Sequence, residues 1–130
     1  DHGSHQVRLA ILPHGPGLHD VLRESEALNT PLREVPPGEA DVAALPVARV
    51  DHPGVQVSAV KRADDGSGDL IMRLYEACGA RTSCTVAMHT RISEAATCNL
   101  LEEPQHAFEV GDGIVALTLR PFELVTLRLK

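Results

Sequence analysis

The chain has 130 residues and a formal net charge of −6, with 12 Lys and Arg against 18 Asp and Glu. This length predicts one domain with a single core. The acidic balance and the lack of any Lys/Arg cluster exclude nucleic acid as a partner, and no apolar run is long enough to span a membrane.

The first elements are a strand and a helix. Val7, Leu9 and Ile11 share one phase of a strand predicted over 6–12, which the breaker cluster 13–17 ends. Residues 1–4 could be native sequence or a remnant of an expression tag. Apolar residues then recur near every 3.6 positions from 18 to 28, which predicts one short amphipathic helix.

The middle of the chain begins with five prolines between Pro31 and Gly54, which predict an irregular crossing with a short strand around 45–50. Residues 55–62 and 70–75 then alternate between apolar and polar on either side of the turn Asp64 to Gly68. This pattern predicts a hairpin with a flexible tip.

Further strands are predicted over 82–89, 95–101 and 107–110, and two more on either side of Pro121 in the final stretch 113–130. A hairpin with a three-residue connection would place Leu119 opposite Val125. The alternative is a kinked strand that crosses between two sheets, and parity alone does not separate them. The whole pattern predicts an all-β fold, an antiparallel β-sandwich of about eight strands with one short helix near the N-terminus.

The spacing of the histidine, cysteine and serine residues does not indicate a catalytic or metal-binding site. The seven histidines are scattered, and Gly66-Ser67-Gly68 lacks the strand-to-helix context of a nucleophile elbow. Cys78, Cys84 and Cys98 cannot all pair and lack zinc spacing, although Cys84 lies in an apolar phase and is expected to be buried. We therefore predict no catalytic, cofactor-binding or metal-binding residue. The free thiols favour a reducing, cytoplasmic location.

Five segments in one order carry a resemblance to a known family. They are His5 to His14, Ala27 to Leu32, Val57 to Lys61, Asp65 to Glu76 and Leu119 to Leu127. Together they resemble the C-terminal β-sandwich region of bacterial α-mannosidases of glycoside hydrolase family 38. The resemblance runs from His5 to the last residue, and it favours residues 1–4 as mostly native.

The resemblance implies that residues 1–130 are a single C-terminal β-sandwich domain, a fragment of a larger retaining mannosidase. In that family a separate catalytic domain carries the zinc ion and the nucleophile, so no catalytic residue is carried over to this chain and no activity is expected of it alone. We expect a non-catalytic accessory domain of an enzyme that hydrolyses terminal α-linked mannose. The alternatives are an autonomous carbohydrate-binding module, which the scarcity of aromatic residues disfavours, and an oligomerisation domain.

Three residues are candidates for contact with other domains of such an enzyme: His14, Arg73 and Glu76. For His14 the alternative is a hydrogen bond within its own loop. For Arg73 and Glu76 the alternative is a cross-strand polar pair on the solvent face, worth well under about 1 kcal/mol. The expected partner is the rest of the mannosidase chain, with a homo-oligomer as a further possibility.

Overall fold

The computed structural model describes residues 2–30 and 46–130. It divides the chain into two compact units, Asp1–Glu34 and Val35–Lys130. Residues 31–45 of the irregular crossing predicted over 31–54, which include the start of the strand expected around 45–50, lie outside the described residues. That residues 1–130 form a single domain stays a prediction.

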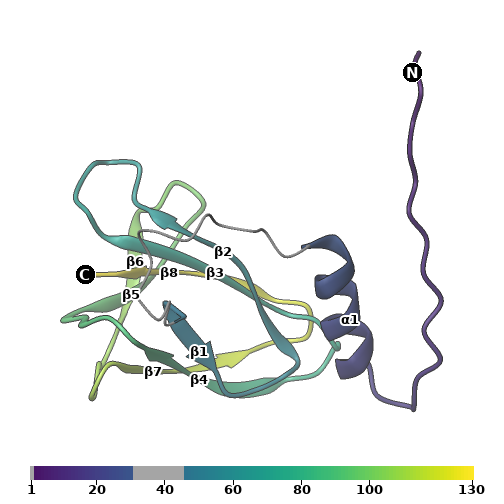
Figure 1. The fold of residues 1–130 in the computed structure, drawn as a ribbon. Coiled ribbons are helices and arrows are strands. Elements are labelled where there is room, and N and C mark those ends of the chain that lie inside the picture. The colour runs from purple at the N-terminus through teal and green to yellow at the C-terminus, as the bar shows by residue number, and fades with distance from the viewer. Residues whose placement is uncertain (1, 31–45) are drawn as a thin grey trace, which may run out of the picture. The chain divides into compact units, whose positions relative to one another are not determined.

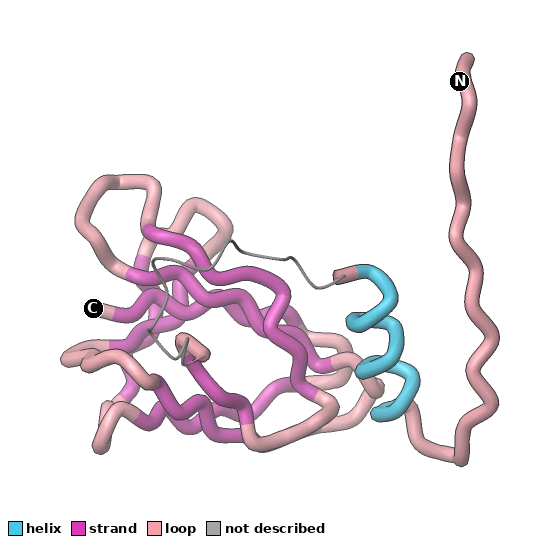
Figure 2. Tube along the Cα trace, in the orientation of Figure 1, coloured by secondary structure: helices cyan, strands magenta, loops and turns pink. Residues whose placement is uncertain are grey.

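The first unit contains an extended segment followed by α1, which spans His19–Asn29 (Figure 2). The helix confirms the prediction to within one residue. The strand predicted over 6–12 is not formed, because a strand needs a neighbour for its backbone N–H and C=O groups and the described part of this unit supplies none. The alternating pattern is therefore present without a sheet.

The second unit contains eight strands in two antiparallel sheets, which confirms the predicted sandwich (Figure 1). One sheet has three strands in the order β1-β4-β7, and the other has five in the order β2-β3-β8-β5-β6. The strand bounds are β1 Ala48–Val50, β2 Val55–Arg62, β3 Leu70–Glu76, β4 Thr82–Met88, β5 Ala95–Cys98, β6 Pro104–Phe108, β7 Ile114–Leu119 and β8 Leu124–Leu129.

The core lies between the two sheets and takes one parity from each strand. Leu74, Val86, Leu119 and Leu127 have no exposed surface, and Cys84 is buried beside them as its phase predicted. Along a strand these core residues alternate with exposed ones, for example along β7, where every second side chain is buried. The period-2 pattern in the sequence therefore identified the inner faces of β4, β7 and β8 correctly, whereas Val57 of β2, which shares the phase of Val55, is exposed.

The final two strands do not form the predicted hairpin. Leu119 of β7 pairs with Thr82 of β4, whereas Val125 of β8 pairs with Leu74 of β3. The chain crosses from one sheet to the other at Pro121, and Phe122 adopts a left-handed φ of 57° in that turn. The kinked, sheet-crossing alternative is correct because each strand buries its apolar phase against a different sheet.

Two other strand predictions need correction at their ends. The β2–β3 hairpin forms as predicted, with a register shift between Val57 and Ala59. The strand expected over 95–101 ends at Cys98, and the one expected over 107–110 starts earlier, at Pro104. Proline is tolerated there because β6 is an edge strand, where one side of the ladder needs no donor.

Candidate functional site

The three predicted contact residues lie in different surroundings. His14 is exposed in the extended segment of the first unit, and its Nδ1 donates a hydrogen bond to the carbonyl oxygen of Gly15 at 2.6 Å. This is the loop hydrogen bond expected as its alternative role. Arg73 and Glu76 both lie on β3 but are three residues apart, so the alternation of the strand places them on opposite faces.

Glu76 is buried at the end of β3, with 1% of its surface exposed, and therefore is not on the solvent face. Its carboxylate accepts hydrogen bonds from the backbone N–H groups of Cys78 at 2.9 Å, Gly79 at 2.7 Å and Phe122 at 3.1 Å. Burial alone would raise the pKa of Glu76. The backbone N–H groups oppose burial and hold the pKa below its ordinary value.

This carboxylate joins two turns that are distant in sequence. Cys78 and Gly79 belong to the β3–β4 connection, and Phe122 belongs to the crossover between β7 and β8. Gly79 has a left-handed φ of 76°, and a Cβ built on it would lie 2.7 Å from Cζ of the Phe122 ring. The sequence therefore places a glycine where the ring lies directly over the turn.

Arg73 projects from the outer face of the five-stranded sheet, directly opposite Thr126 of β8. Its Nε is buried and has no hydrogen-bond partner in the described part of the chain. Its charge also reaches the Cys98 thiol. Burial and the charge of Glu102 raise the pKa of Cys98, and the charges of Arg128 and Arg73 oppose that rise. Arg73 thus carries a donor that the described residues leave unused.

A groove of about 490 Å³ lies on the same outer face. Thr126, opposite Arg73, is part of its lining, together with Leu124 and Leu100. These two leucines are 53% and 73% exposed. At the rim, Arg120 Nη2 forms an ion pair with Glu123 Oε1 at 2.7 Å. We use the name outer-face groove for this groove together with the neighbouring Arg73.

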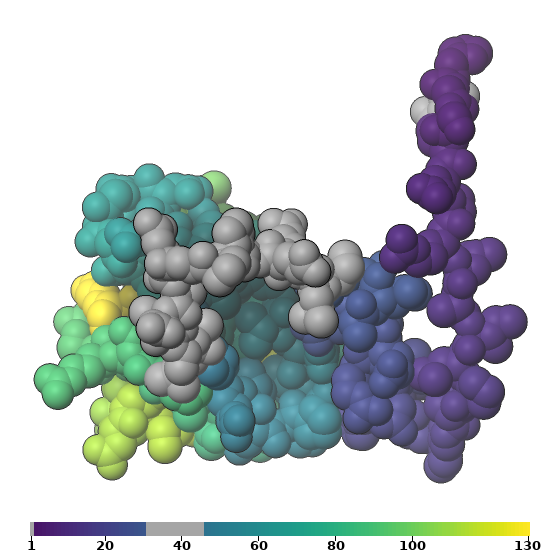
Figure 3. Space-filling model, viewed as in Figure 1, coloured from purple at the N-terminus to yellow at the C-terminus, as the bar shows by residue number. Residues whose placement is uncertain are grey.

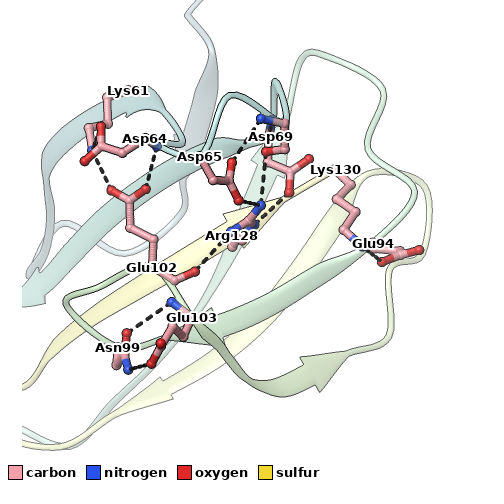
Figure 4. Close-up of polar contacts among 11 residues, drawn as sticks. Lys61, Asp64, Asp65, Asp69, Glu94, Asn99, Glu102, Glu103, Arg128 and Lys130 are labelled. Atoms are coloured by element: carbon pink, nitrogen blue, oxygen red, sulfur yellow. Dashed lines mark hydrogen bonds and ion pairs between the residues drawn. The ribbon is translucent and has the colours of Figure 1, made fainter.

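A second polar cluster covers the outer face further along β8 (Figure 4). Arg128 donates from Nε to Asp69 at 2.7 Å and from Nη2 to Asp65 at 2.6 Å, and it also donates to the backbone carbonyl of Glu102 at 3.2 Å. The Glu102 carboxylate accepts the backbone N–H of Asp64 at 2.9 Å and pairs with Lys61. These contacts hold the tip of the β2–β3 hairpin and the β5–β6 loop together.

We call these polar residues the Arg128 cluster: Lys61, Asp64, Asp65, Asp69, Glu102 and Arg128. The Arg128 cluster covers a small group of buried apolar residues, Ala63, Ile71 and Cys98. The tip of the β2–β3 hairpin, which the sequence predicted to be flexible, is held in place by the hydrogen bonds from Arg128 to Asp65 and Asp69. Hydrogen bonds from Ser67, from the Ser67 backbone and from Arg128 hold the pKa of Asp65 well below its usual range. These carboxylates have partners within the chain, and their role is structural.

Sequence reasoning missed the Arg128 cluster and the two exposed leucines. Arg128 stands in the polar phase of the last strand, and the aspartates stand in a turn, so each has an ordinary solvent interpretation. Only the pairing of Ile71 with Arg128 across β3 and β8 brings them together. No local signal in the sequence reports that pairing.

The described residues contain no group of three or more His, Cys, Asp or Glu placed to hold a metal ion. They also contain no helix long and apolar enough to cross a membrane. The features of the described residues that can act on another molecule are the half-buried Arg73 side chain, the exposed leucines and a groove. This arrangement suits docking of a protein surface better than covalent chemistry.

Comparison with known proteins gives two findings. Residues 54–127, more than half of the chain, match the model of the glycosyl hydrolases family 38 C-terminal beta sandwich domain. The chain is 32% identical to human alpha-mannosidase 2C1 and 31% identical to the mouse protein of the same name, in each case over 99% of the chain. It spans only 13% of the length of these relatives.

Proposed function

The chain belongs to glycosyl hydrolase family 38, as a C-terminal beta sandwich domain, and on that premise we propose that it is a non-catalytic accessory domain of an α-mannosidase. The enzyme would hydrolyse terminal α-linked mannose from oligosaccharides. One observation carries this proposal: nearly the whole chain aligns with a small part of each relative, which leaves most of such an enzyme outside it.

The zinc ion implied by the family resemblance would be held by the catalytic domain of that enzyme. The described residues of this chain do not offer a set of ligands for it. Zinc would supply Lewis-acid chemistry at the sugar. The residues of this chain would instead contribute a stable sandwich and a surface for the neighbouring domains.

The outer-face groove supplies that surface. Leu100 and Leu124 offer apolar area to a neighbouring domain, and the half-buried side chain of Arg73 would turn its guanidinium toward a carbonyl or carboxylate of the same partner. Glu76 would act indirectly, because its carboxylate already holds the turn that carries Phe122. His14, which lies in the first unit, would contact another domain of the enzyme. The occupant we propose is the rest of the mannosidase polypeptide.

Location and source stay proposals. We propose a cytoplasmic enzyme because the buried thiols of Cys84 and Cys98 are not joined in a disulfide. A bacterial source is suggested by the sequence resemblance, whereas the relatives reported above are mammalian.

The docking role is tested by Arg73→Ala in the full-length enzyme. We expect faster thermal inactivation of mannosidase activity with an unchanged KM, because the substitution weakens domain contact without touching the sugar. Arg91→Ala is the matched control, since Arg91 is an exposed arginine on a loop after β4. Equal inactivation of the two variants would contradict docking through Arg73.

The carbohydrate-binding alternative is tested by titrating the isolated chain with mannose while following backbone amide shifts. Its strongest support in the structure is Phe122, whose ring is 73% exposed. We expect no localised shifts at millimolar sugar. Saturable shifts around Phe122 would instead establish a sugar-binding module.

A further inference from the structure

The extended segment of the first unit presents apolar side chains without a partner. Val7, Leu9 and Ile11 are 77%, 88% and 96% exposed, and they alternate with Gln6, Arg8 and Ala10. Figure 3 shows this segment in purple as a narrow column of atoms, and Figure 2 shows its extended trace. A strict alternation is the pattern of a strand that buries one face and exposes the other.

Among the described residues, the backbone of the same segment also has no hydrogen-bond partner. Between residues 6 and 12, no backbone hydrogen bond to any other described residue is found. Extended backbone with free N–H and C=O groups is a template for pairing with the edge of a sheet. Side chains and backbone therefore indicate the same missing element.

Helix α1 has a similar deficit. No residue of α1 is buried, and its apolar positions Val21, Leu22 and Leu28 are only half-buried. A groove of about 530 Å³ runs between the helix and the segment, and its lining includes Ile11 and Leu28. One strand and one helix are too few to enclose a core, because even an isolated pair of strands is marginal in water and a stable layer needs a sheet with an apolar face to pack on.

We propose that residues 6–12 form a β-strand at the edge of a sheet that belongs to the preceding part of the full-length enzyme, with α1 packed on the apolar face of that sheet. The inference rests on the proposed function, which makes this chain one part of a longer polypeptide. In this proposal the boundary between the preceding domain and the sandwich lies after α1. Residues 6–12 fall outside the family match over 54–127, yet the relatives, which are far longer than this chain, align with nearly all of it.

A second copy of the chain fits the observations less well. Two copies of the segment paired with each other would give an isolated two-stranded ribbon, which is marginal in water. Pairing with an edge of the five-stranded sheet of another copy would meet the register shift of β2 or Pro104 of β6. The edges β1 and β7 of the three-stranded sheet carry neither feature, and pairing with them is detected by the elution measurement below. A preceding sheet with a one-sided apolar face satisfies the alternation directly.

The test is amide hydrogen exchange of residues 7–11 in the full-length enzyme and in the 130-residue chain. We expect exchange about 100-fold slower in the full-length enzyme, because ladder bonds must open first. We expect rapid exchange in the 130-residue chain. Rapid exchange in both proteins would overturn the proposal. Slow exchange in the 130-residue chain together with concentration-dependent elution would overturn it in favour of a second copy.

A matched pair of substitutions tests the direction of the strand face. Leu9→Gln in the full-length enzyme should lower the apparent unfolding midpoint by about 2–4 °C, whereas Arg8→Gln should change it by less than about 1 °C. Equal effects would contradict a strand with one buried face. Mannosidase activity is measured separately on the same preparation. Slow exchange without activity would reject the proposed function and leave the strand assignment standing.

Discussion

Glu76 is an almost fully buried carboxylate whose partners are backbone N–H groups of two turns. Because its folded pKa lies below its ordinary value of 4.5, its contribution to stability is complete above that pH and is lost as the pH falls through the folded pKa. Glu76→Gln replaces a charged acceptor with a neutral amide. The variant should be less stable than the parent at neutral pH.

The comparison that isolates the charge is urea unfolding at neutral pH and at about pH 4. The difference in unfolding free energy between Glu76→Gln and the parent should shrink on acidification. Glu109→Gln, at an exposed position of the loop before β7, should behave like the parent at both pH values. A difference that stays constant with pH would show that the ionised form of Glu76 is not responsible.

Gly79 combines a left-handed backbone with close approach of the Phe122 ring. Gly66 has a similar φ of 75°, but a Cβ there would meet nothing within 4 Å. Both Gly→Ala variants should lose about 1–2 kcal/mol from backbone strain. Gly79→Ala should lose about 1 kcal/mol more, because the ring must move. The excess should vanish in a Phe122→Ala background, as a double-mutant cycle of unfolding free energies would show.

The site could be predicted from single residues only in part. Arg73 and Glu76 were selected together, although a spacing of three along a strand already places them on opposite faces. Which face is buried follows from the apolar parity of Met72 and Leu74, and Glu76 shares that parity. The hydrogen bond from Phe122 to Glu76, across 46 positions, has no counterpart in the local sequence.

At the scale of elements, the Arg128 cluster joins three of them: the β2–β3 tip, β8 and the β5–β6 loop (Figure 4). Arg128→Leu should release the tip around Asp65 and Asp69 and uncover Cys98, which is 7% exposed beneath the cluster. The rate of Cys98 modification by an aromatic disulfide reagent should rise several-fold.

Cys84 is the internal control for this measurement, since it lies in the core between the sheets. Lys130→Leu is the control variant, because it removes the ion pair between Lys130, which follows β8, and Glu94, which precedes β5, without touching the groove that Cys98 lines. If both cysteines become reactive together in Arg128→Leu, the substitution has unfolded the sandwich as a whole. That outcome would contradict local release of the tip.

The elements themselves show where sequence patterns are sufficient. Alternation on either side of Asp64 to Gly68 predicted the β2–β3 hairpin, because a short turn brings adjacent strands together whatever the rest of the chain does. The same alternation around Pro121 could not distinguish a hairpin from a crossover. Leu119 is buried and Val125 is partly buried, as either arrangement would allow, and the choice depends on contacts with the distant strands β4 and β3.

At the scale of the whole molecule, the buried residues of the main core that the structure describes lie between Val55 and Leu129, with Ala48 and Val50 of β1 packed against them. A chain of residues 46–130 should therefore unfold at the same midpoint as the 130-residue chain, within about 2 °C, by circular dichroism. A large loss of stability on removing residues 1–45 would show that the first unit contributes to the core of the isolated chain. It would also contradict the placement of α1 on a preceding sheet.

The strand order β2-β3-β8-β5-β6 also sets the order of events during synthesis. The hairpins β2–β3 and β5–β6 leave the ribosome before β8, which must insert between β3 and β5 (Figure 1). Until it does so, two strand edges stay open on the nascent chain, and open edges invite pairing with other chains. The late insertion of β8 therefore makes the nascent sandwich prone to aggregation. The rate at which the ribosome translates the segment containing β8 should affect the yield of folded protein.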